Sequence, residues 1–408
     1  MDLGVHRMIK NISALSLIQL TNALIPLIIL PHLIRVLGPE NYGNIIYVQS
    51  IMLLLVIIVE FGFSTTVTRH ISRKRNIDLS ISIATTNTLF IQFVLLLTVS
   101  IALLCFGMFV GMSVEFFCGI GILLGQAAQP IWLFQGIEKL GRYSIAFILS
   151  KLFTLPLMYV FVNTTDDVNH ALLIFSVSSV FTSIALLTLL VMEVKIKAEY
   201  LNLSYQLKLL NRSKSIFFSL ATISTYTGLI PIAIGLIGGY QELASFNIAE
   251  RIKSAIQSLV RPISLAFFPR IVWLLKGGFG NAVSIMRTSA ILQISITFLI
   301  GLIVSFFSAD IVFLFSGLEI NESIFTLRIM ALIPFFASIS TIIGTQIMLP
   351  LGKNKQFFLC IFGGGCISIF FMFPVISEYG AIGAGCLMII VEIIISFLMI
   401  VWLARHNR

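Results

Sequence analysis

The feature that most constrains this chain is the recurrence of apolar runs of about 20 residues along its whole length. A run of that length crosses the hydrocarbon layer of a bilayer as a helix. Only 11% of the 408 residues are charged, less than half of the roughly one quarter that is usual in soluble domains. The sequence therefore predicts an all-α integral membrane protein and excludes a soluble enzyme, a nucleic-acid-binding domain and a disordered protein.

Hydropathy divides the chain into twelve predicted transmembrane segments. They run approximately 12–34, 44–66, 80–108, 116–134, 144–162, 170–192, 215–237, 245–269, 288–308, 323–350, 356–376 and 380–403. The loops between them are short, and the longest, about 193–214, lies near the middle. No loop is long enough to form a folded domain of its own.

The basic residues are sorted by loop. Twenty of the 26 Lys and Arg lie at the two termini and on the even-numbered loops, whereas the odd-numbered loops hold acids and no Lys or Arg. Because cytoplasmic loops are enriched in Lys and Arg, both termini are predicted to be cytoplasmic. One missed span would mix the two kinds of loop, so the segregation also supports the count of twelve.

Two similar halves are predicted: an N-lobe of six spans at 1–193 and a C-lobe of six spans at 215–408, joined by a cytoplasmic loop at 194–214. At an offset of about 201 residues, Gly38 lies opposite Gly239 in similar loops. The same offset pairs Glu60 with Arg261 and Arg69 with Arg270. Parallel repeats of this kind predict a substrate path through a central cavity between the lobes and alternating access by rocking.

Nine charges fall inside the predicted spans or, in the case of Arg35, directly at the external end of the first one. A charge at the centre of a lipid-facing helix costs about 2.5–3.5 kcal/mol, so nine would cost on the order of 20 kcal/mol, more than the roughly 5–15 kcal/mol that stabilises a typical fold. Most of these side chains must therefore face one another or a water-filled interior. They are Arg35, Lys151, Arg251, Lys253, Arg261 and Arg328, with the acids Glu60, Glu250 and Glu392.

The eighth span shows the clearest pattern. Glu250, Lys253, Gln257 and Arg261 are spaced by 3, 4 and 4 residues, which places them on one helical face. We interpret this face as the lining of a cavity. The alternative, a structural Glu250–Lys253 pair that joins helices, leaves Gln257 and Arg261 unexplained.

From these patterns we assign three groups of candidate site residues. The interior charge of +3 suits an anionic solute such as a phosphate or pyrophosphate; for the two arginines near external span ends, Arg35 and Arg328, snorkelling to the surface is an equal alternative. Substrate binding is assigned to Lys151, Lys253, Arg261, Arg251, Arg35, Arg328 and Gln257; ion coupling or pairing to Glu60, Glu250 and Glu392; and a cytoplasmic gate to Arg69, Arg270, Gln135 and Glu138.

No motif of nucleotide or metal chemistry is present. The chain has no P-loop pattern, and the five cysteines lie in or beside apolar spans without metal-ligand spacing. We therefore expect no cofactor and no metal site. The basic N-terminus precedes an apolar run that is too long for a signal peptide, so we expect it to be the first span.

Several stretches resemble O-antigen repeat-unit flippases of the Wzx type. The stretch 60–69, EFGFSTTVTR, is similar to the end of span two in that family, although this chain has Glu60 where the pattern has Asp or Tyr. The stretch 130–139, PIWLFQGIEK, resembles the end of span four, and 344–353, GTQIMLPLGK, resembles the end of span ten. The stretch 37–43, LGPENYG, is shared more widely among polysaccharide transporters.

The resemblance implies a member of the multidrug/oligosaccharidyl-lipid/polysaccharide (MOP) exporter superfamily in the bacterial inner membrane. Such proteins flip an undecaprenyl-pyrophosphate-linked oligosaccharide by alternating access, and the resemblance implies coupling to H⁺ or Na⁺. Partners would be the lipid-linked glycan, the bilayer, and a polysaccharide polymerase with its chain-length regulator, but no nucleic acid. The protein would be a transporter and not an enzyme.

Three alternatives stay open at this point. A drug or metabolite exporter of the same superfamily would need acids for cationic drugs, whereas this interior is net positive. An integral-membrane polysaccharide polymerase or ligase would resemble a plan with a large, basic external loop, which the sequence does not have. A passive channel is disfavoured by the repeat.

Overall fold

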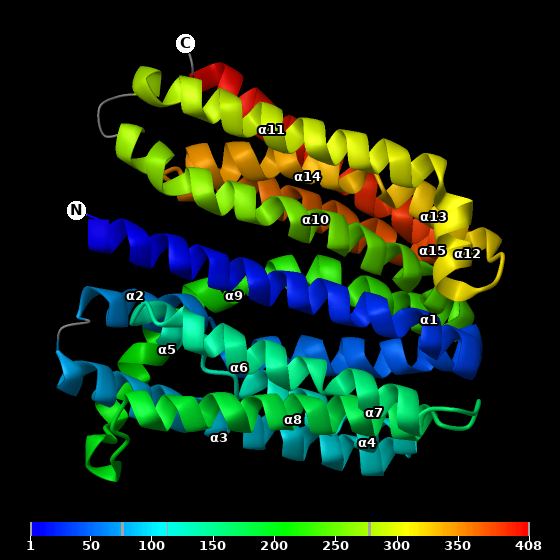
Figure 1. Cartoon of the computed structure of the whole chain (residues 1–408), viewed down its shortest axis with the longest axis horizontal. Coiled ribbons are helices and arrows are strands. Elements are labelled where there is room, and N and C mark those ends of the chain that lie inside the picture. The colour runs from blue at the N-terminus through cyan, green and yellow to red at the C-terminus, as the bar shows by residue number, and fades with distance from the viewer. Residues whose placement is uncertain (1, 75–76, 112, 276–278, 407–408) are drawn as a thin grey trace. The chain divides into compact units, whose positions relative to one another are not determined.

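The computed structural model describes residues 2–74, 77–111, 113–275 and 279–406, and this part of the chain is helical without strands (Figure 1). Arg75, Lys276 and Arg408, which the sequence assigns to cytoplasmic loops, lie outside the described residues. The all-α prediction is confirmed. Many large apolar side chains are exposed, among them Phe109 and Phe306, as expected for helices that face lipid.

The helices cover all twelve predicted segments. In chain order they are α1 Asp2–Glu60, α2 Phe63–Arg73, α3 Asp78–Val110, α4 Val114–Ala127, α5 Ile131–Gly136, α6 Leu140–Leu152, α7 Thr154–Phe161, α8 Val168–Glu193, the 3₁₀ turn η1 Ala198–Tyr200, α9 Leu203–Ile237, α10 Gly239–Leu275, α11 Phe279–Phe306, α12 Ser308–Ser316, α13 Asn321–Met330, α14 Ile333–Thr341, the π-helix η2 Ile342–Met348 and α15 Asn354–His406. α1 contains the first predicted span and most of the second, and α15 contains the last two; the two spans of each helix meet at the non-helical residues Gly38 and Gly380.

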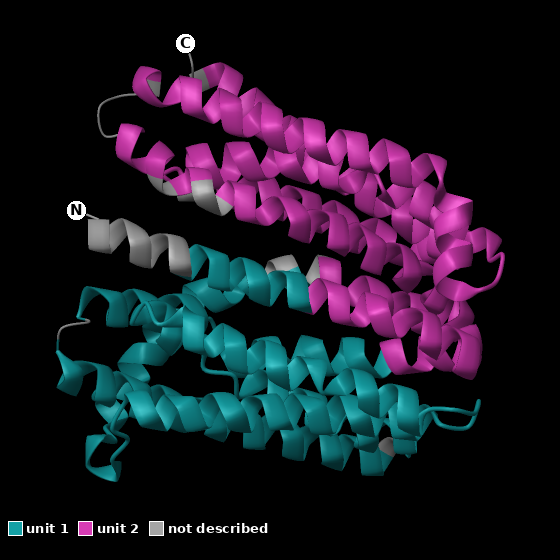
Figure 2. Cartoon of the chain, in the orientation of Figure 1, with its two compact units in different colours: residues 1–21, 47–224 teal, residues 22–46, 225–408 magenta. Residues whose placement is uncertain are grey.

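The chain forms two compact units (Figure 2). Unit 1 contains residues 1–21 and 47–224, and unit 2 contains residues 22–46 and 225–408. The division falls inside α1 and α9, so that the hairpin around Gly38 packs with the second unit. There the backbone of Tyr240 lies where a Cβ on Gly43 would stand, which explains the small residue at that position.

Several predicted spans are interrupted helices. Phe61 and Gly62 have φ angles of 42° and 73° and separate α1 from α2, while Pro130 stands between α4 and α5. Proline cannot donate a backbone hydrogen bond, and positive φ is natural only to glycine. Breaks of this kind within a membrane are tolerated where protein or water covers the freed backbone groups.

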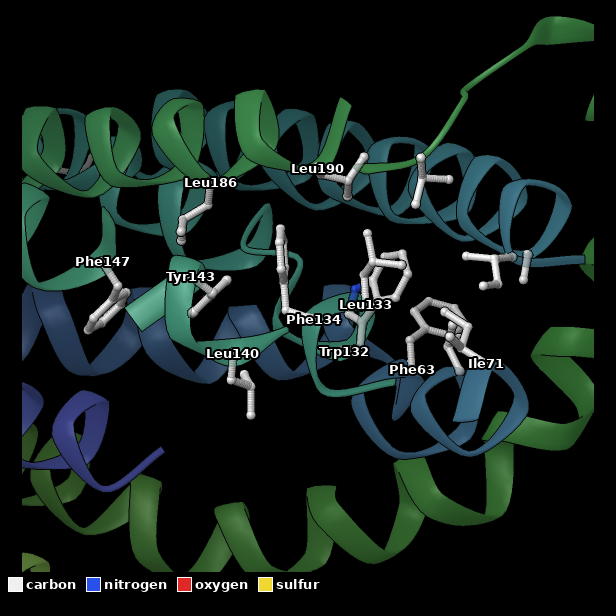
Figure 3. Close-up of a cluster of buried hydrophobic side chains, with 14 of the residues drawn as sticks. Phe63, Ile71, Trp132, Leu133, Phe134, Leu140, Tyr143, Phe147, Leu186 and Leu190 are labelled. Carbon is white, nitrogen blue, oxygen red and sulfur yellow. The ribbon is translucent and has the colours of Figure 1, made fainter. Parts of the chain in front are cut away.

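The most specific sequence motif, PIWLFQGIEK, builds the core of unit 1. Trp132, Leu133 and Phe134 on α5 are almost fully buried and pack with Phe63 of α2 and Tyr143 of α6, as Figure 3 shows. The hydroxyl of Thr68 on α2 also donates to the Trp132 carbonyl at 2.9 Å. The motif therefore fastens α2 to α5.

The central loop is anchored to unit 1 by one buried amide. The Oδ1 atom of Asn87, on α3, accepts from the Asn202 backbone N–H at 3.0 Å and from Gln206 Nε2 at 3.1 Å, and its Nδ2 donates to the Tyr200 carbonyl at 2.8 Å. Asn87 is fully buried. A buried polar group is stable only with such partners, so these hydrogen bonds hold the loop at one defined position against α3.

The predicted internal repeat has counterparts in local backbone conformation. Gly38 and Gly239, which the repeat aligns, have φ angles of 81° and 84°. The ends of the fourth and tenth spans also share one capping motif. The Lys139 N–H donates to the Phe134 carbonyl, and the Lys353 N–H donates to the Met348 carbonyl, both at 2.9 Å.

This is the Schellman motif, in which the residue before the final donor adopts a left-handed conformation. That residue is Glu138, with φ of 58°, at the first end and Gly352, with φ of 74°, at the second. The two halves of the chain therefore end these spans with the same capping conformation but with different residues at the left-handed position.

Candidate functional site

The polar face of α10 begins with an ion pair. The Lys253 ammonium lies 2.7 Å from Glu250 Oε2, and only 6% of the Lys253 side chain is exposed. Ser254 donates to the other oxygen, Glu250 Oε1, at 3.1 Å. Glu250 and Lys253 therefore form an ion pair within α10 itself, one turn apart, and this pair does not join two helices.

A second carboxylate accompanies this pair. Glu392 on α15 is half-buried, accepts from the Ser340 hydroxyl of α14 at 2.7 Å, and lies within electrostatic range of Lys253. One buried ammonium therefore faces two carboxylates. Such a cluster can take up one further cation or proton, because its formal charge with both acids ionised is −1.

Farther along the same face of α10, the helix lines a cavity of about 350 Å³ inside unit 2. The residues that α10 contributes have the i, i+3, i+4, i+7 spacing of one helical face, and those of α14 repeat it. The lining consists of Gln257, Val260, Arg261 and Ser264 from α10, Gln293 and Thr297 from α11, Pro334, Ala337, Ser338 and Thr341 from α14, and Thr345 from η2. No carboxylate is among these lining residues.

A closed ring of hydrogen bonds lies beside this cavity. Ser264 Oγ donates to Gln293 Oε1 at 2.5 Å, and Gln293 Nε2 donates to Ser289 Oγ at 2.7 Å. Ser289 Oγ donates to Gln346 Oε1 at 3.1 Å, and Gln346 Nε2 donates back to Ser264 Oγ at 3.0 Å. The ring joins α10 and α11 to the π-helix η2. A π-turn is frequent at functional sites, and here it carries Gln346 of the GTQIMLPLGK stretch.

Three of the predicted cationic residues, Arg251, Arg35 and Arg328, contact protein groups in unit 2. Asn247 Oδ1 accepts both from Arg251 Nε at 3.3 Å and from the buried hydroxyl of Tyr42 at 2.7 Å. Arg35 donates to the Leu314 carbonyl at 3.1 Å, at the end of α12, where a cation is favourable.

Arg328 meets the opposite end of α12. Its Nε donates to the Ser308 hydroxyl at 3.3 Å, and its guanidinium lies 5.6 Å from the centre of the Phe325 ring. Arg35 and Arg328 are both exposed and together hold the two ends of one short helix.

Unit 1 holds Glu60 and Lys151, both of which are half-buried. Glu60 is the last residue of α1, directly before the break, where Phe61 stacks on Phe217 of α9 with ring centres 4.5 Å apart. Lys151 lies at the end of α6, at another break.

The candidate gate residues are spread over both units. In unit 1, Arg69 on α2 and Glu138 after α5 are exposed, and Gln135 is half-buried. Next to Glu138 in the chain, Lys139 forms an ion pair with Glu193, with 2.5 Å between Nζ and Oε2. Arg142 forms a second ion pair with Glu193, with 2.9 Å between Nη1 and Oε1. In unit 2, the Arg270 guanidinium lies 5.3 Å from the centre of the Trp273 ring.

Sequence reasoning missed the uncharged part of the cavity. Ser289, Gln293 and Thr297 follow one another at four-residue intervals within the ninth span, and this polar stripe was a usable signal. Among the described residues no group of His, Cys, Asp or Glu could hold a metal ion. The lining offers one guanidinium, two amides and several hydroxyls, which suits an anionic or hydroxyl-rich solute.

Comparison with solved structures identifies the fold. A multidrug resistance MATE family transporter of the MOP superfamily matches with a TM-score of 0.69 in its outward-facing structure, at 17% identity over 97% of this chain and 94% of that one. The inward-facing structure of a MATE family transporter also gives 0.69, at 15% identity over 93% of this chain and 97% of that one. The chain therefore has the fold of MOP superfamily transporters.

Sequence comparison identifies the family. The chain is 30% identical over 403 residues to the "Putative O-antigen transporter" of Escherichia coli (strain K12), covering 98% of this chain and 97% of the relative. It is 29% identical to a protein of the same description from Shigella dysenteriae, over 96% of this chain and 98% of that one. Residues 8–275 match the family model described as polysaccharide biosynthesis protein, and the chain belongs to that family.

Proposed function

We propose that this protein is a flippase that moves an undecaprenyl-pyrophosphate-linked O-antigen or similar polysaccharide repeat unit across the bacterial inner membrane. One observation carries the proposal: Arg261, whose side chain is exposed, stands on a polar helix face that lines a cavity of unit 2, and this lining includes no carboxylate. The family and the description of its relatives as O-antigen transporters support it. Transport would proceed by alternating access between an N-lobe at 1–193 and a C-lobe at 215–408.

In this proposal Arg261 binds the pyrophosphate. A guanidinium offers five donors in a fixed fork that matches phosphate oxygens and remains charged at any physiological pH. Lys253 already has a carboxylate partner, and Arg35, Arg251 and Arg328 already contact protein groups. We therefore rank Arg261 above these residues as a phosphate ligand. Lys151 is the candidate of unit 1.

Coupling to a proton or sodium gradient is assigned to the cluster of Glu250, Lys253 and Glu392, with Glu60 as a second candidate in unit 1. The cluster has one more acid than base, so it can release or bind one cation as its surroundings change. Flipping by purified protein in liposomes with imposed gradients tests this assignment. Glu392→Gln should remove the gradient dependence, and the exposed Glu378→Gln should keep it; a wild type that ignores both gradients contradicts the assignment.

The structural likeness to multidrug transporters favours a second candidate function, export of drugs or metabolites. Organic cations need carboxylates or aromatic faces, and the described cavity has an arginine instead. A polysaccharide polymerase or ligase is the remaining alternative of a different class. The transporter descriptions of both relatives weigh against it. Association with a polymerase and its chain-length regulator is part of the proposal.

The test is complementation of a strain that lacks the gene. We expect Arg261→Ala and Lys253→Ala to abolish surface polysaccharide and to accumulate lipid-linked repeat units, with the protein present in the membrane at normal amounts. Arg261→Lys should restore part of the polysaccharide, and the exposed Arg287→Ala should restore all of it. Normal polysaccharide with both Arg261→Ala and Lys253→Ala would show that the polar face of α10 is structural.

A further inference from the structure

We propose that a cleft at one end of unit 1 binds the headgroup of a phospholipid that carries a primary ammonium beside its phosphate, as phosphatidylethanolamine does. The cleft is formed by residues of unit 1 alone, and the inference does not depend on the substrate proposed above. Its basis is the set of charges that line the cleft, one buried hydroxyl without a partner, and the exposed apolar side chains beside it.

The cleft is formed where segments of unit 1 begin or end. It has a volume of about 290 Å³, and its lining comes from the start of α3, the turn after α5 and the end of α8. Figure 1 shows α3 beginning and α8 ending on the same side of this unit, which the sorting of Lys and Arg predicts to be cytoplasmic. The lining consists of Asp78, Ile81, Ser82, Ile137, Lys139, Glu193, Val194 and Lys195.

The charges of this lining sum to zero, because it holds two acids and two lysines. Glu193 is already neutralised, since Lys139 and Arg142 contact its two oxygens at 2.5 and 2.9 Å. Within the described part of the chain, the side chains of Asp78 and Lys195 make no hydrogen bond or ion pair. The cleft therefore presents one unpaired carboxylate and one unpaired ammonium, which matches a ligand with one charge of each sign.

A buried hydroxyl also lines the cleft. Ser82 lies one turn after Asp78 on α3 and is only 6% exposed. A serine in a helix often donates to the carbonyl four residues earlier, as Ser16 does with Ile12. The Ser82 hydroxyl makes no hydrogen bond to any residue that the structure describes. A buried polar group of this kind needs a partner from a ligand or from water.

The two ends of the headgroup then have separate partners. Lys195 and Ser82 donate to the phosphate oxygens. The Lys139 ammonium has three N–H groups and uses one on Glu193, so it also has donors left for the phosphate. Asp78 accepts from the ammonium of the lipid. A primary ammonium offers three N–H donors to a carboxylate, whereas the trimethylammonium of phosphatidylcholine offers none, so Asp78 distinguishes the two headgroups.

Apolar side chains beside the cleft favour a lipid over a soluble molecule with the same two charges. Ile77 and Leu79 flank Asp78 and are 53% and 56% exposed, and Ile196, next to Lys195, is 41% exposed. Only 17% of the most apolar stretch of α3 is buried in the protein. Acyl chains can therefore follow α3 away from the headgroup and cover this apolar surface.

The experiment measures lipid binding to the full chain in detergent micelles by native mass spectrometry. The probes are phosphatidylethanolamine, its N-methyl and N,N-dimethyl derivatives, phosphatidylcholine and phosphatidylglycerol, all with the same acyl chains. We expect the affinity to fall as methyl groups replace the N–H donors. Phosphatidylethanolamine should bind at least about five times more tightly than phosphatidylcholine or phosphatidylglycerol, because only its ammonium can donate to a carboxylate.

Variants separate the roles of the two unpaired charges. Asp78→Asn should weaken phosphatidylethanolamine about 3–10-fold, between the value of an exposed ion pair and that of a charge-assisted hydrogen bond, and remove the preference over phosphatidylcholine. Asp78→Glu should keep the preference. Lys195→Gln should weaken all five lipids alike, because all carry the phosphate. Glu199→Gln and Lys208→Gln are the matched controls, since both residues are exposed in unit 1 and neither lines the cleft. Each variant is first compared with the wild type in thermal unfolding.

Glycerophosphoethanolamine, which has the headgroup without acyl chains, separates a lipid site from a site for a soluble zwitterion. It should bind at least about ten times more weakly than the lipid, because it buries no apolar surface, and equal binding overturns the lipid assignment. The inference is also overturned if the wild type does not distinguish phosphatidylethanolamine from phosphatidylcholine, or if Asp78→Asn keeps the preference. The methylation series uses the wild type alone, so it decides the matter even if a variant fails to fold.

Discussion

Replacement of Gln346 by leucine tests whether the hydrogen-bond ring acts as one unit. The change substitutes an apolar side chain that is one atom shorter and removes two hydrogen bonds, from Gln346 Nε2 to Ser264 and from Ser289 to Gln346 Oε1. It also leaves the hydroxyl of Ser289, which is fully buried, without its acceptor. The perturbation thus has two separable parts.

The two lost bonds contribute about 1–2 kcal/mol together, taking about 0.6 kcal/mol per bond from membrane proteins and about 1 kcal/mol from soluble ones. The buried hydroxyl of Ser289 adds its desolvation, about 1–3 kcal/mol. Gln346→Leu should therefore lower the free energy of unfolding by about 2–5 kcal/mol. The orphaned hydroxyl is the larger part.

This ranking makes the double mutant decisive. Ser289→Ala alone removes two ring bonds, to Gln346 Oε1 and from Gln293 Nε2, but Gln293 Nε2 keeps its other acceptor, the Ser289 carbonyl at 3.1 Å. In Gln346→Leu with Ser289→Ala no hydroxyl is orphaned, so the double mutant should be at least about 1 kcal/mol more stable than the sum of the single effects predicts. Unfolding in mixed detergent–SDS micelles measures each step. Thr288→Val, outside the ring, should combine additively with Gln346→Leu. Additivity at Ser289 as well would refute the ring as a coupled unit.

Three further predictions concern other parts of the chain. Glu250→Gln should lower the free energy of unfolding by about 2 kcal/mol. This is less than the 3–5 kcal/mol lost when one partner of a fully buried ion pair is removed, because Glu392 still faces Lys253. In the same unfolding assay, replacement of the exposed Glu199 by Gln is the control and should cost less than about 0.5 kcal/mol. Asn87→Leu should release the central loop, with a loss of about 2–3 kcal/mol for three hydrogen bonds, seen as faster proteolysis between residues 194 and 206; unchanged cleavage would contradict the anchoring. Backbone N–H groups of Asn163 and Thr164 lower the pKa of Asp167 below its ordinary value of 3.8. The contribution of Asp167 to the free energy of unfolding is therefore complete above pH 3.8 and disappears as the pH falls through the lower pKa of the folded state. Asp167→Asn should flatten the acid side of a plot of stability against pH, and an unchanged plot would count against the loop geometry.

The sequence predicted the helical fold well because the bilayer leaves few choices. Apolar length and the sorting of Lys and Arg defined twelve segments, all of which are helical in the structure. The breaks inside the spans were harder to predict, since only Gly62 and Pro130 marked two of them. Phe61 takes a positive φ against its own preference, because tertiary packing on α9 overrides local propensity.

The sequence predicted only part of the site, again because contacts between distant segments are not visible in local patterns. The stripe of Glu250, Lys253, Gln257 and Arg261 follows from helical spacing on one element. Which of these residues pair with one another and which line the cavity depends on α14 and α15, far away in the sequence. Thr341 illustrates this limit. A threonine in an apolar span usually donates to a carbonyl of its own helix, and the sequence alone does not indicate that Thr341 lines the cavity.

The shared capping motif of the fourth and tenth spans has a consequence for the trade-off between stability and function. At the left-handed position the tenth span has Gly352, whereas the fourth has Glu138 with φ of 58°. A side chain held there costs on the order of 1 kcal/mol that glycine avoids. Glu138→Gly should thus make the protein more stable. Glu138 is a predicted gate residue, and in that role its carboxylate would serve transport at the expense of a more stable resting fold.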